Sequence, residues 1–222
     1  MTSGNPKAQT EPRYIAVEGP IGVGKTSLCK RLAETFGYDL LLEKSEDNPF
    51  LDRFYQNKRQ NALATQLYFL LQRAQQIQEL RQNDIFKPTR VADFLIEKDR
   101  LFARQTLDQD EFRLYESVYS HLALDGPTPD LVIYLQAPTE VLLERIRHRG
   151  IAAEQHIERH YLEQLNEAYM EFFHYYDSTS LLIVNSAQID LVNHDSDYKL
   201  LVDYLLNLTG GTHYFNPKPT LL

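Results

Sequence analysis

Short apolar runs alternate with longer amphipathic segments along most of the chain. Continuous apolar runs are typical of strands in a sheet that helices cover on both faces. Predicted strands lie at residues 14–17, 39–42, 89–93, 131–135 and 181–184. Strands that alternate with helices favour parallel pairing, because each return connection needs a crossover. The pattern therefore predicts an α/β fold in three layers, a P-loop NTPase-type fold with a five-stranded parallel sheet flanked by helices.

The segments between these runs have the periodicity of amphipathic helices. In the longest segment, apolar residues recur at helical spacing from Leu63 to Leu80. Helices are predicted at residues 24–36, 62–81, 94–107, 110–124, 138–148, 157–176 and 198–208, and another opens at Pro49. We expect one domain over residues 13–209, a disordered tail over 1–12 and a tail without clear structure over 210–222.

A glycine-rich motif lies between the first predicted strand and the first predicted helix. Residues 19–26 read GPIGVGKT and match the phosphate-loop pattern G-x-x-x-x-G-K-[ST]. Glycines let the backbone approach a phosphate closely, at the positive end of a helix dipole. The lysine brings a charge to the β- and γ-phosphates, and the threonine offers a hydroxyl to Mg²⁺. The sequence therefore predicts an ATP site made by Gly19, Pro20, Ile21, Gly22, Val23, Gly24, Lys25, Thr26 and Ser27.

Two carboxylates fall where predicted strands end. Glu43 follows the second strand, and Asp93 ends the third. Ligands of an open parallel sheet bind outside the carboxyl ends of its strands, so both side chains should point toward the phosphate loop. Phosphoryl transfer to a hydroxyl needs a group that takes the proton and a group that holds the metal. We expect Glu43, Asp93 and Lys25 to be catalytic, and Thr26 and Asp93 to bind Mg²⁺, although a helix cap is a competing interpretation of Asp93.

A dense basic run lies near residue 145 of this acidic chain. Arg145 and Arg149 are four residues apart and share one face of a predicted helix. We expect both to bind ATP, with Arg145 neutralising charge as the γ-phosphoryl group leaves. Residues 150–155 would then form a short, mobile lid. The alternative is a solvated helix end, where the helix dipole favours cations.

Charge and composition narrow the possible partners. The formal net charge of −8 argues against a broad nucleic-acid or membrane surface, since both attract Lys and Arg. No apolar run reaches the roughly 20 residues of a membrane-spanning helix. The one cysteine, Cys29, cannot form an internal disulfide, which fits a reducing compartment, and we expect a cytoplasmic protein. Cys29 itself is interpreted as a core residue, and His156 and His160 lack the third ligand of a metal site.

Four segments together resemble the deoxynucleoside kinase family, especially its bacterial deoxyadenosine/deoxyguanosine kinase branch. They are residues 18–26, 43–55, 66–73 and 145–154, and the similarity runs from about residue 14 to about residue 169. The EDNPFL stretch and the ordered spacing are more specific than the phosphate loop alone. The resemblance implies a kinase that uses ATP and Mg²⁺ to phosphorylate the 5′-hydroxyl of a deoxynucleoside, with purines favoured. It also implies a homodimer formed through long helices such as the one from Leu63 to Leu80.

The resemblance implies roles for residues around the sugar. Glu43 matches the family's acid that approaches the 5′-hydroxyl as a base, and Asp93 matches the acid near Mg²⁺ and the reacting hydroxyl. Tyr55 and Glu154 match residues that bind the sugar 3′-hydroxyl. A site that pairs with this hydroxyl would reject sugars that lack it, because buried polar groups would lose their partners.

Three further residues match positions around the nucleobase. Gln66 matches the glutamine that pairs with the base edge, which suits an amide that can donate and accept in one plane. Arg73 and Asp99 match residues at the base end of the pocket. The resemblance therefore implies that one pocket contains Glu43, Tyr55, Gln66, Arg73, Asp99 and Glu154.

The chain departs from the family pattern at two positions. Phe94 stands where the family usually has an arginine after the acid, and Ile151 stands where many members have a third lid arginine. Each departure removes a positive charge from the region of the transition state, and losing one such group can cost about 10²–10³ in rate. Lys98, Arg100 or Arg104 could compensate.

Two other functions fit the same motifs. A nucleoside monophosphate kinase of the thymidylate type shares the phosphate loop and the lid, but its charged acceptor needs an arginine-rich pocket, whereas Glu43 favours an uncharged hydroxyl. A sensor that binds ATP without turnover would fit the charges missing at Phe94 and Ile151.

Overall fold

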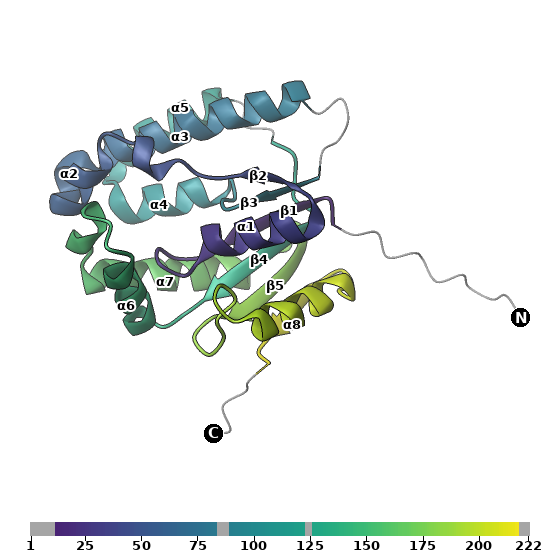
Figure 1. Cartoon of the computed structure of the whole chain (residues 1–222). Helices are drawn as coiled ribbons and strands as arrows, with labels where there is room; N and C mark the ends of the chain where they lie inside the picture. Colours follow the sequence, from purple (N-terminus) through teal and green to yellow (C-terminus); the bar gives the residue numbers. More distant parts are fainter. Residues whose placement is uncertain (1–11, 84–88, 123–125, 218–222) are drawn as a thin grey trace, which may run out of the picture.

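The computed structural model describes residues 12–83, 89–122 and 126–217, and in this part of the chain six parallel strands form one sheet (Figure 1). Their spatial order is β2-β3-β1-β4-β5-β6, so the phosphate-loop strand β1 is central. The strands are β1 (Tyr14–Glu18), β2 (Asp39–Leu41), β3 (Arg90–Ala92), β4 (Leu131–Gln136), β5 (Ser180–Asn185) and β6 (Thr212–Phe215). The α/β class and the parallel sheet that the sequence predicts are thus confirmed.

Helices cover both faces of the sheet. They are α1 (Lys25–Phe36), α2 (Leu51–Gln56), α3 (Lys58–Asn83), α4 (Lys98–Thr106), α5 (Gln109–His121), α6 (Thr139–Arg149), α7 (Arg159–His174) and α8 (Asp195–Leu206), with 3-10 turns η1 (Ser45–Asp47) and η3 (Ala153–His156). Helices α1, α6 and α8 pack in one core, and α7 contributes its first turn to that core and its later turns to a second one. On the side of the sheet where β2 is the edge strand, α3 and α5 lie side by side with α4 (Figure 1).

The central strand shows how the sequence sets these layers. Ile15 and Val17 are buried against the α1 side, whereas Ala16 between them is buried against the α7 side. This alternation follows from the two-residue period of a strand, and burial on both faces explains the continuous apolar run. Cys29 is fully buried among the α1-side residues, which confirms its interpretation as a core residue.

The sheet has six strands and not the five expected, and the expectation that residues 210–222 lack clear structure is wrong for β6. Strand Thr212–Phe215 pairs in parallel with β5 at the sheet edge. Its burial alternates, since Tyr214 is 72% exposed while Phe215 is 6% exposed. A short, half-exposed edge strand has too few apolar positions for its pattern to stand out. Residues 1–11, with most of the expected N-terminal tail, lie outside the described residues.

Several helix bounds also differ from the expected ones. Helix α4 begins at Lys98 and not at residue 94, because the backbone N–H of Leu95 donates to the Glu18 carboxylate at 2.6 Å. Helix α3 begins four residues earlier than expected, at Lys58. The helix expected at Pro49 begins at Leu51, after Asn48 Oδ1 has accepted the N–H of Phe50 at 3.0 Å. Within the described ranges, every helix is too short or too polar to cross a bilayer.

Candidate active site

The phosphate loop joins β1 to α1 with a backbone that only glycine adopts readily. Gly19 has φ 148° and Gly22 has φ 84°. A Cβ on Gly19 would lie 2.5 Å from the Leu135 carbonyl oxygen, and one on Gly22 would lie 2.8 Å from Ile146 Cγ1. The loop is therefore wedged between the end of β4 and helix α6, and larger residues at these two positions would push it out of place.

Two cations predicted to bind ATP contact the backbone of this loop. Lys25 Nζ donates to the carbonyl oxygens of Gly19 at 2.8 Å and Pro20 at 3.3 Å. Arg145 donates to the carbonyl oxygen of Val23 at 3.2 Å and to that of Ser186 at 2.7 Å. Lys25 also lines the cavity described below, but Arg145 does not. Lys25 therefore borders both the loop and the cavity, whereas Arg145 contacts the loop without lining the cavity.

The two strand-end carboxylates meet beside the loop. Asp93 follows β3 directly and accepts the Thr26 hydroxyl at 2.6 Å and the backbone N–H of Glu43 at 2.7 Å. Asp93 thus ties the end of β2 to the start of α1. The hydroxyl and the carboxylate that were expected to bind Mg²⁺ are in direct contact, and the helix-capping interpretation of Asp93 has no support, because no side-chain bond caps α4.

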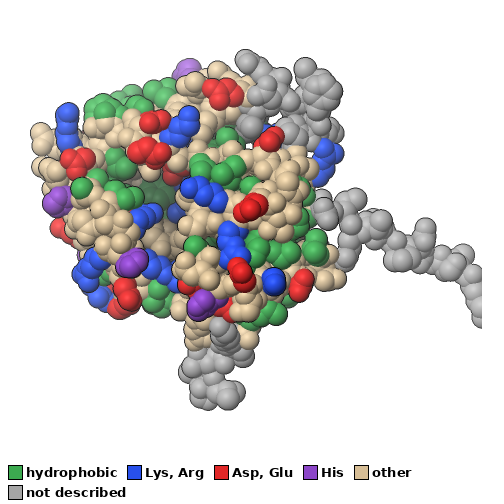
Figure 2. Space-filling view, viewed as in Figure 1, with side chains coloured by type: hydrophobic (Ala, Val, Ile, Leu, Met, Phe, Trp, Pro, Cys, Tyr) green, Lys and Arg blue, Asp and Glu red, His purple; other side chains and the backbone are tan. Residues whose placement is uncertain are grey.

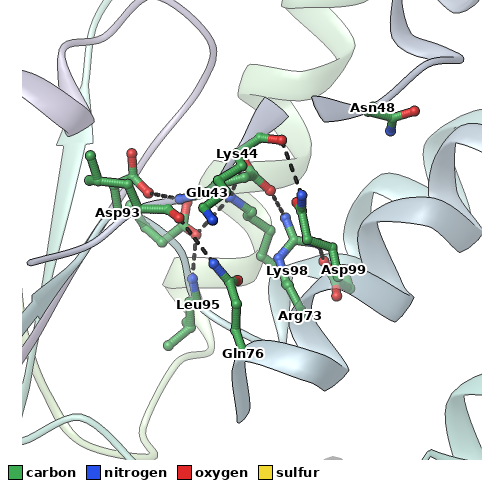
Figure 3. Close-up of polar contacts among 12 residues, drawn as sticks. Glu43, Lys44, Asn48, Arg73, Gln76, Asp93, Leu95, Lys98 and Asp99 are labelled. Atoms are coloured by element: carbon green, nitrogen blue, oxygen red, sulfur yellow. Dashed lines mark hydrogen bonds and ion pairs between the residues drawn. The ribbon is translucent and has the colours of Figure 1, made fainter. Parts of the chain in front are cut away.

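A chain of buried charges extends from these carboxylates into the protein (Figure 3). The Arg73 guanidinium binds Glu43 with one nitrogen and Asp99 with another. Lys98 Nζ lies 3.1 Å from a Glu18 carboxylate oxygen and 3.8 Å from Glu43. Buried charges persist when they are paired, and here acids and bases alternate from Glu18 to Asp99.

Their surroundings shift the ionisation of these groups. Burial alone would raise the pKa of Glu43, but Arg73, Lys98 and Lys25 hold it below its usual value. Burial lowers the pKa of Lys25, and the neighbouring charge of Lys98 lowers it further. Burial would also lower the pKa of Lys98, yet the Glu18 and Glu43 carboxylates raise it above its usual value. Glu43 is thus an ionised carboxylate held between cations.

A cavity that is partly open to solvent lies over the loop and the carboxylates. It opens on the face seen in Figure 2, where the surface is hollowed. Lys25, Thr26, Glu43 and Asp93 line one end. All the residues expected to bind the acceptor line this same cavity, namely Glu43, Tyr55, Gln66, Arg73, Asp99 and Glu154. The sequence alone places them far apart, and the structure brings them together.

The far end of the cavity combines aromatic walls with unpaired polar atoms. Phe69 and Phe102 are among its lining residues. Gln66 is buried, and its amide makes no hydrogen bond with the described part of the chain. Asp99 Oδ2 is buried and also lacks a partner among the described residues. Unpaired buried polar groups are costly, so these two atoms are suited to a ligand that supplies partners.

The lid residues lie at the mouth of the cavity. Arg149, in the last turn of α6, forms an ion pair with Glu154 in η3. Tyr55 lies 8% exposed in α2, and both burial and the nearby Glu154 carboxylate raise the pKa of its hydroxyl. Arg149 was expected to bind ATP and Glu154 to bind the sugar. In this structure the two side chains pair with each other instead. Ile151, 45% exposed, brings no charge here.

Sequence reasoning missed one residue of the site and undervalued another. Glu18 is fully buried, and its carboxylate accepts the N–H groups of Gly19 at 3.0 Å and Leu95 at 2.6 Å. An acid at the end of an otherwise apolar strand was the available signal. Lys98 is 3% exposed and lines the cavity, although the sequence suggested it only as one of three possible compensating cations.

Replacing Asp99 with asparagine should change how stability depends on pH. Burial raises the pKa of Asp99 from its usual 3.8 to about 6, although Arg73 and Lys98 oppose this. The folded protein then binds more protons than the unfolded chain between these values, so stability falls as pH rises through them. The free energy of unfolding of Asp99→Asn, relative to the parent, should rise by up to about 3 kcal/mol between about pH 4 and about pH 7. Urea unfolding at a series of pH values measures it, and parallel pH curves for the two proteins would contradict it.

Known proteins resemble this chain over most of its length. A family model described as deoxynucleoside kinase matches residues 15–208. The chain is 34% identical over 200 residues to a deoxyguanosine kinase of Bacillus subtilis (strain 168), covering 88% of this chain and 97% of that protein. It is 29% identical over 204 residues to a deoxyadenosine/deoxycytidine kinase of the same organism, covering 87% and 92%. The solved structure of deoxyadenosine kinase from M. mycoides with bound dATP matches with a TM-score of 0.75 and 26% identity, covering 86% of this chain and 98% of that one.

These comparisons confirm the resemblance that the four sequence segments suggested. They favour an enzyme that phosphorylates deoxynucleosides over a monophosphate kinase or a sensor without turnover. The family match, over residues 15–208, includes the phosphate loop, both strand-end carboxylates and residues 150–155. The chain therefore belongs to the deoxynucleoside kinase family.

Proposed function

We propose that this kinase transfers the γ-phosphoryl group of ATP to the 5′-hydroxyl of a deoxynucleoside and that it favours purine deoxynucleosides. The observation that carries the proposal is a cavity that joins Lys25 and Thr26 of the phosphate loop to Glu43 and Asp93. An acceptor hydroxyl at this junction would lie beside both the donor phosphate and a carboxylate, which is the arrangement that in-line transfer needs.

The donor is proposed to lie on the loop of residues 19–26, with Ser27 beside it, Arg149 above it and Arg145 behind it. Thr26 and Asp93 fit Mg²⁺, because a hydroxyl and a carboxylate 2.6 Å apart are both hard oxygen ligands. Mg²⁺ keeps several waters and phosphate oxygens in such enzymes, so the two protein oxygens suffice. When bound, it would supply charge neutralisation at the β- and γ-phosphates.

The proton of the acceptor is proposed to pass to Glu43. The 5′-oxygen attacks the γ-phosphorus, the bond to the oxygen bridging to the β-phosphate breaks, and ADP leaves with that electron pair. Arg73 and Lys98 on either side of Glu43 keep it ionised, so it is ready to accept a hydrogen bond from the hydroxyl. Asp93, bonded to the backbone N–H of Glu43, positions it.

The far end of the cavity is proposed to bind the base. Phe69 and Phe102 offer apolar walls to a ring, and Gln66 and Asp99 Oδ2 offer unpaired polar atoms to its edge. A purine carries both donors and acceptors on that edge, which Gln66 can match. Tyr55 and Glu154 are proposed to bind the 3′-hydroxyl, which requires Glu154 to leave Arg149 or to share its carboxylate.

Replacing Gln66 with leucine should raise KM for the deoxynucleoside by about 10–100-fold, because hydrogen bonds in a buried pocket are each worth about 1–3 kcal/mol. KM for ATP should stay unchanged, since the amide lies on the acceptor side. Steady-state kinetics with each substrate varied in turn measures both values. Gln75→Leu is the matched control, because Gln75 lies on the same helix and bonds to Glu79 at the surface. Equal KM values in Gln66→Leu and the parent would remove Gln66 from the base site.

A substrate panel tests the proposed function. The purified chain, ATP and Mg²⁺ are combined with each of the four deoxynucleosides and, separately, with each of their monophosphates. We expect transfer to deoxyadenosine or deoxyguanosine in preference to the pyrimidines, and none to the monophosphates. Preferred transfer to a monophosphate would favour the thymidylate-type alternative, and nucleotide binding without transfer to any acceptor would favour the sensor.

A homodimer is proposed as the working form. Its support is apolar surface on two adjacent helices, since Leu71 of α3 is 53% exposed and Leu114 of α5 is 52% exposed. Sedimentation would show a dimer that charged substitutions at these leucines convert to a monomer. The kinase domain is proposed to cover residues 13–209, with β6 extending its sheet, and a cytoplasmic location stays a prediction.

A further inference from the structure

A buried lysine faces the junction between donor and acceptor, and the function proposed above gives it no role at the phosphate. Lys98 lies at the start of α4, with its side chain 4% exposed. Its ammonium group lies 3.1 Å from Glu18, beneath the phosphate loop, and 3.8 Å from Glu43. The first distance is a close ion pair, and the second is too long for a good hydrogen bond. An ammonium has three donors, so Lys98 keeps capacity for another partner.

The residue after Asp93 is Phe94, which carries no charge, so this position does not supply the cation that the family usually has there. Phe94 is 1% exposed and contacts the Arg73 guanidinium with its ring, 5.7 Å from the ring centre. Arg73 itself is held by carboxylates on both sides, Glu43 and Asp99, which leaves it little freedom to contact a phosphate. A charge that neutralises the transferred group on the acceptor side would therefore come from another residue.

The structure distinguishes the three cations on the next helix. Arg100 pairs with Glu116 at the surface and lies 5.0 Å over the ring of Tyr119. Arg104 lies 5.5 Å over the ring of Phe112. Neither arginine lines the active-site cavity, whereas Lys98 does, together with Lys25. The two lysines are close enough that the charge of Lys98 lowers the pKa of Lys25.

Resting on the proposed function, we propose that Lys98 is a catalytic residue that contacts the phosphoryl group during its transfer. Lys25 binds the β- and γ-phosphates from the loop side, and Lys98 binds an equatorial oxygen of the same γ-phosphoryl group from the α4 side. The 5′-oxygen forms its bond to phosphorus while the bond to the ADP oxygen breaks, and the negative charge on the equatorial oxygens lies between two ammonium groups. Glu18 and Glu43 anchor Lys98 at this place.

A cation so placed acts on the transition state more than on bound ATP. In bound ATP the γ-phosphate is still attached to the leaving group, and contacts from Lys98 strengthen as the phosphoryl group moves toward Glu43. Preorganised charges that act where charge moves raise kcat. A lysine that only kept Glu43 ionised would instead lower kcat through the pKa of that base. The kcat of Lys98→Met would then return to the parent value at high pH, where Glu43 is ionised in both proteins, and such a return would also overturn the proposal.

Kinetics of three variants test the proposal. Lys98→Met should lower kcat by about 10²–10³-fold and change KM for ATP by less than about threefold. Lys98→Arg keeps the charge, so its kcat should be at least about tenfold higher than that of Lys98→Met. Arg100→Met is the matched control, since it removes a charge from the same helix outside the cavity, and should keep parent kcat. If Lys98→Met keeps parent kcat, or if its loss lies wholly in KM for ATP, the proposal is wrong.

Binding of a transition-state mimic gives a second readout that needs no turnover. Calorimetry with ADP, Mg²⁺, aluminium fluoride and the deoxynucleoside reports a planar anion at the position of the transferred group. Lys98→Met should bind ADP alone as the parent does and lose about 10²-fold or more in affinity for the complete mimic. Equal loss for ADP and the mimic would overturn the proposal.

A further variant, Lys98→Gln, is the control for a possible folding defect of Lys98→Met. Lys98→Gln removes the charge and keeps an N–H donor that can face Glu18, so it should fold more readily than Lys98→Met and show the same loss of kcat. Parent-level kcat in Lys98→Gln would overturn the proposal. If the parent protein phosphorylates no deoxynucleoside, the proposed function is wrong. If the parent is active and the Lys98 variants keep its kcat, only the proposal about Lys98 is wrong.

Discussion

Replacing Lys25 with methionine should lower kcat/KM by at least about 10³-fold. Lys25 Nζ lies on the carbonyl oxygens of Gly19 and Pro20, at the end of the loop that faces Asp93 and Glu43. A triphosphate on the loop would offer this half-buried ammonium stronger, charged acceptors than two neutral carbonyls. Methionine keeps most of the length of the side chain and removes the ammonium group, so the loss reports its charge and its donors. Coupled assays of ADP release measure it.

Two controls separate this effect from damage to the fold. Lys30→Met removes a charge from an exposed position of the same helix and should keep parent activity. Thermal unfolding of Lys25→Met should match the parent or exceed it, since burial already lowers the pKa of Lys25 and disfavours its charged form. A Lys25→Met enzyme with more than roughly a tenth of parent kcat/KM would contradict the proposed place of the triphosphate.

The parts of the site that the sequence predicted are those whose chemistry is local. The loop of residues 19–26 is contiguous, and Glu43 and Asp93 follow apolar runs whose strand character can be read directly. Parallel strands then bring their ends together whatever the details of packing. The phosphate loop, the strand-end acids and the parallel sheet could therefore be predicted, because each depends on short segments of the sequence.

The parts that the sequence did not reveal depend on long-range packing. The contacts of Lys98 with Glu18 and Glu43 are set by the angle at which α4 leaves β3. The position of Arg145 depends on how closely α6 packs on the loop, and spacing along α6 placed it on the same face as Arg149 but could not show that Val23 and Ser186 would take its donors. The residues that contact one another in such a pocket lie far apart in the sequence, so the sequence alone does not show which of them pair.

The same contrast explains the missed edge strand. Strand β1 is buried on both faces and is apolar at four successive residues, from Tyr14 to Val17. Strand β6 is paired only with β5 and has one buried side chain, Phe215. Its hydrogen bonds to β5 are formed by the backbone, which leaves no mark on residue types. A strand at the edge of a sheet is therefore harder to predict than one at its centre.

Replacing Arg73 with methionine should lower the free energy of unfolding by about 3–5 kcal/mol at neutral pH, the usual cost of removing one partner from a buried ion pair. The Arg73 side chain is 5% exposed and pairs with Glu43 and Asp99, whose side chains are 20% and 3% exposed. Without it, two carboxylates would share a cavity with Lys98 as their nearest remaining cation. The ionised form of Glu43 would be less stabilised, because Arg73 would no longer pair with it. The base end of the pocket would also lose the side chain that positions Asp99.

The cause of this loss can be isolated with a second substitution. If the unpaired charge of Asp99 is responsible, Arg73→Met combined with Asp99→Asn should be more stable than Arg73→Met alone by at least about 1 kcal/mol, because the coupling between contacting residues is of this size or larger. Urea unfolding of the four proteins in this double-mutant cycle measures the coupling. Activity should stay low in the double variant, since Glu43 still lacks its partner and the base end lacks both polar groups. Additive losses would instead show that the packing of Arg73 against Phe69 and Phe94, and not its charge, holds α3 to this site.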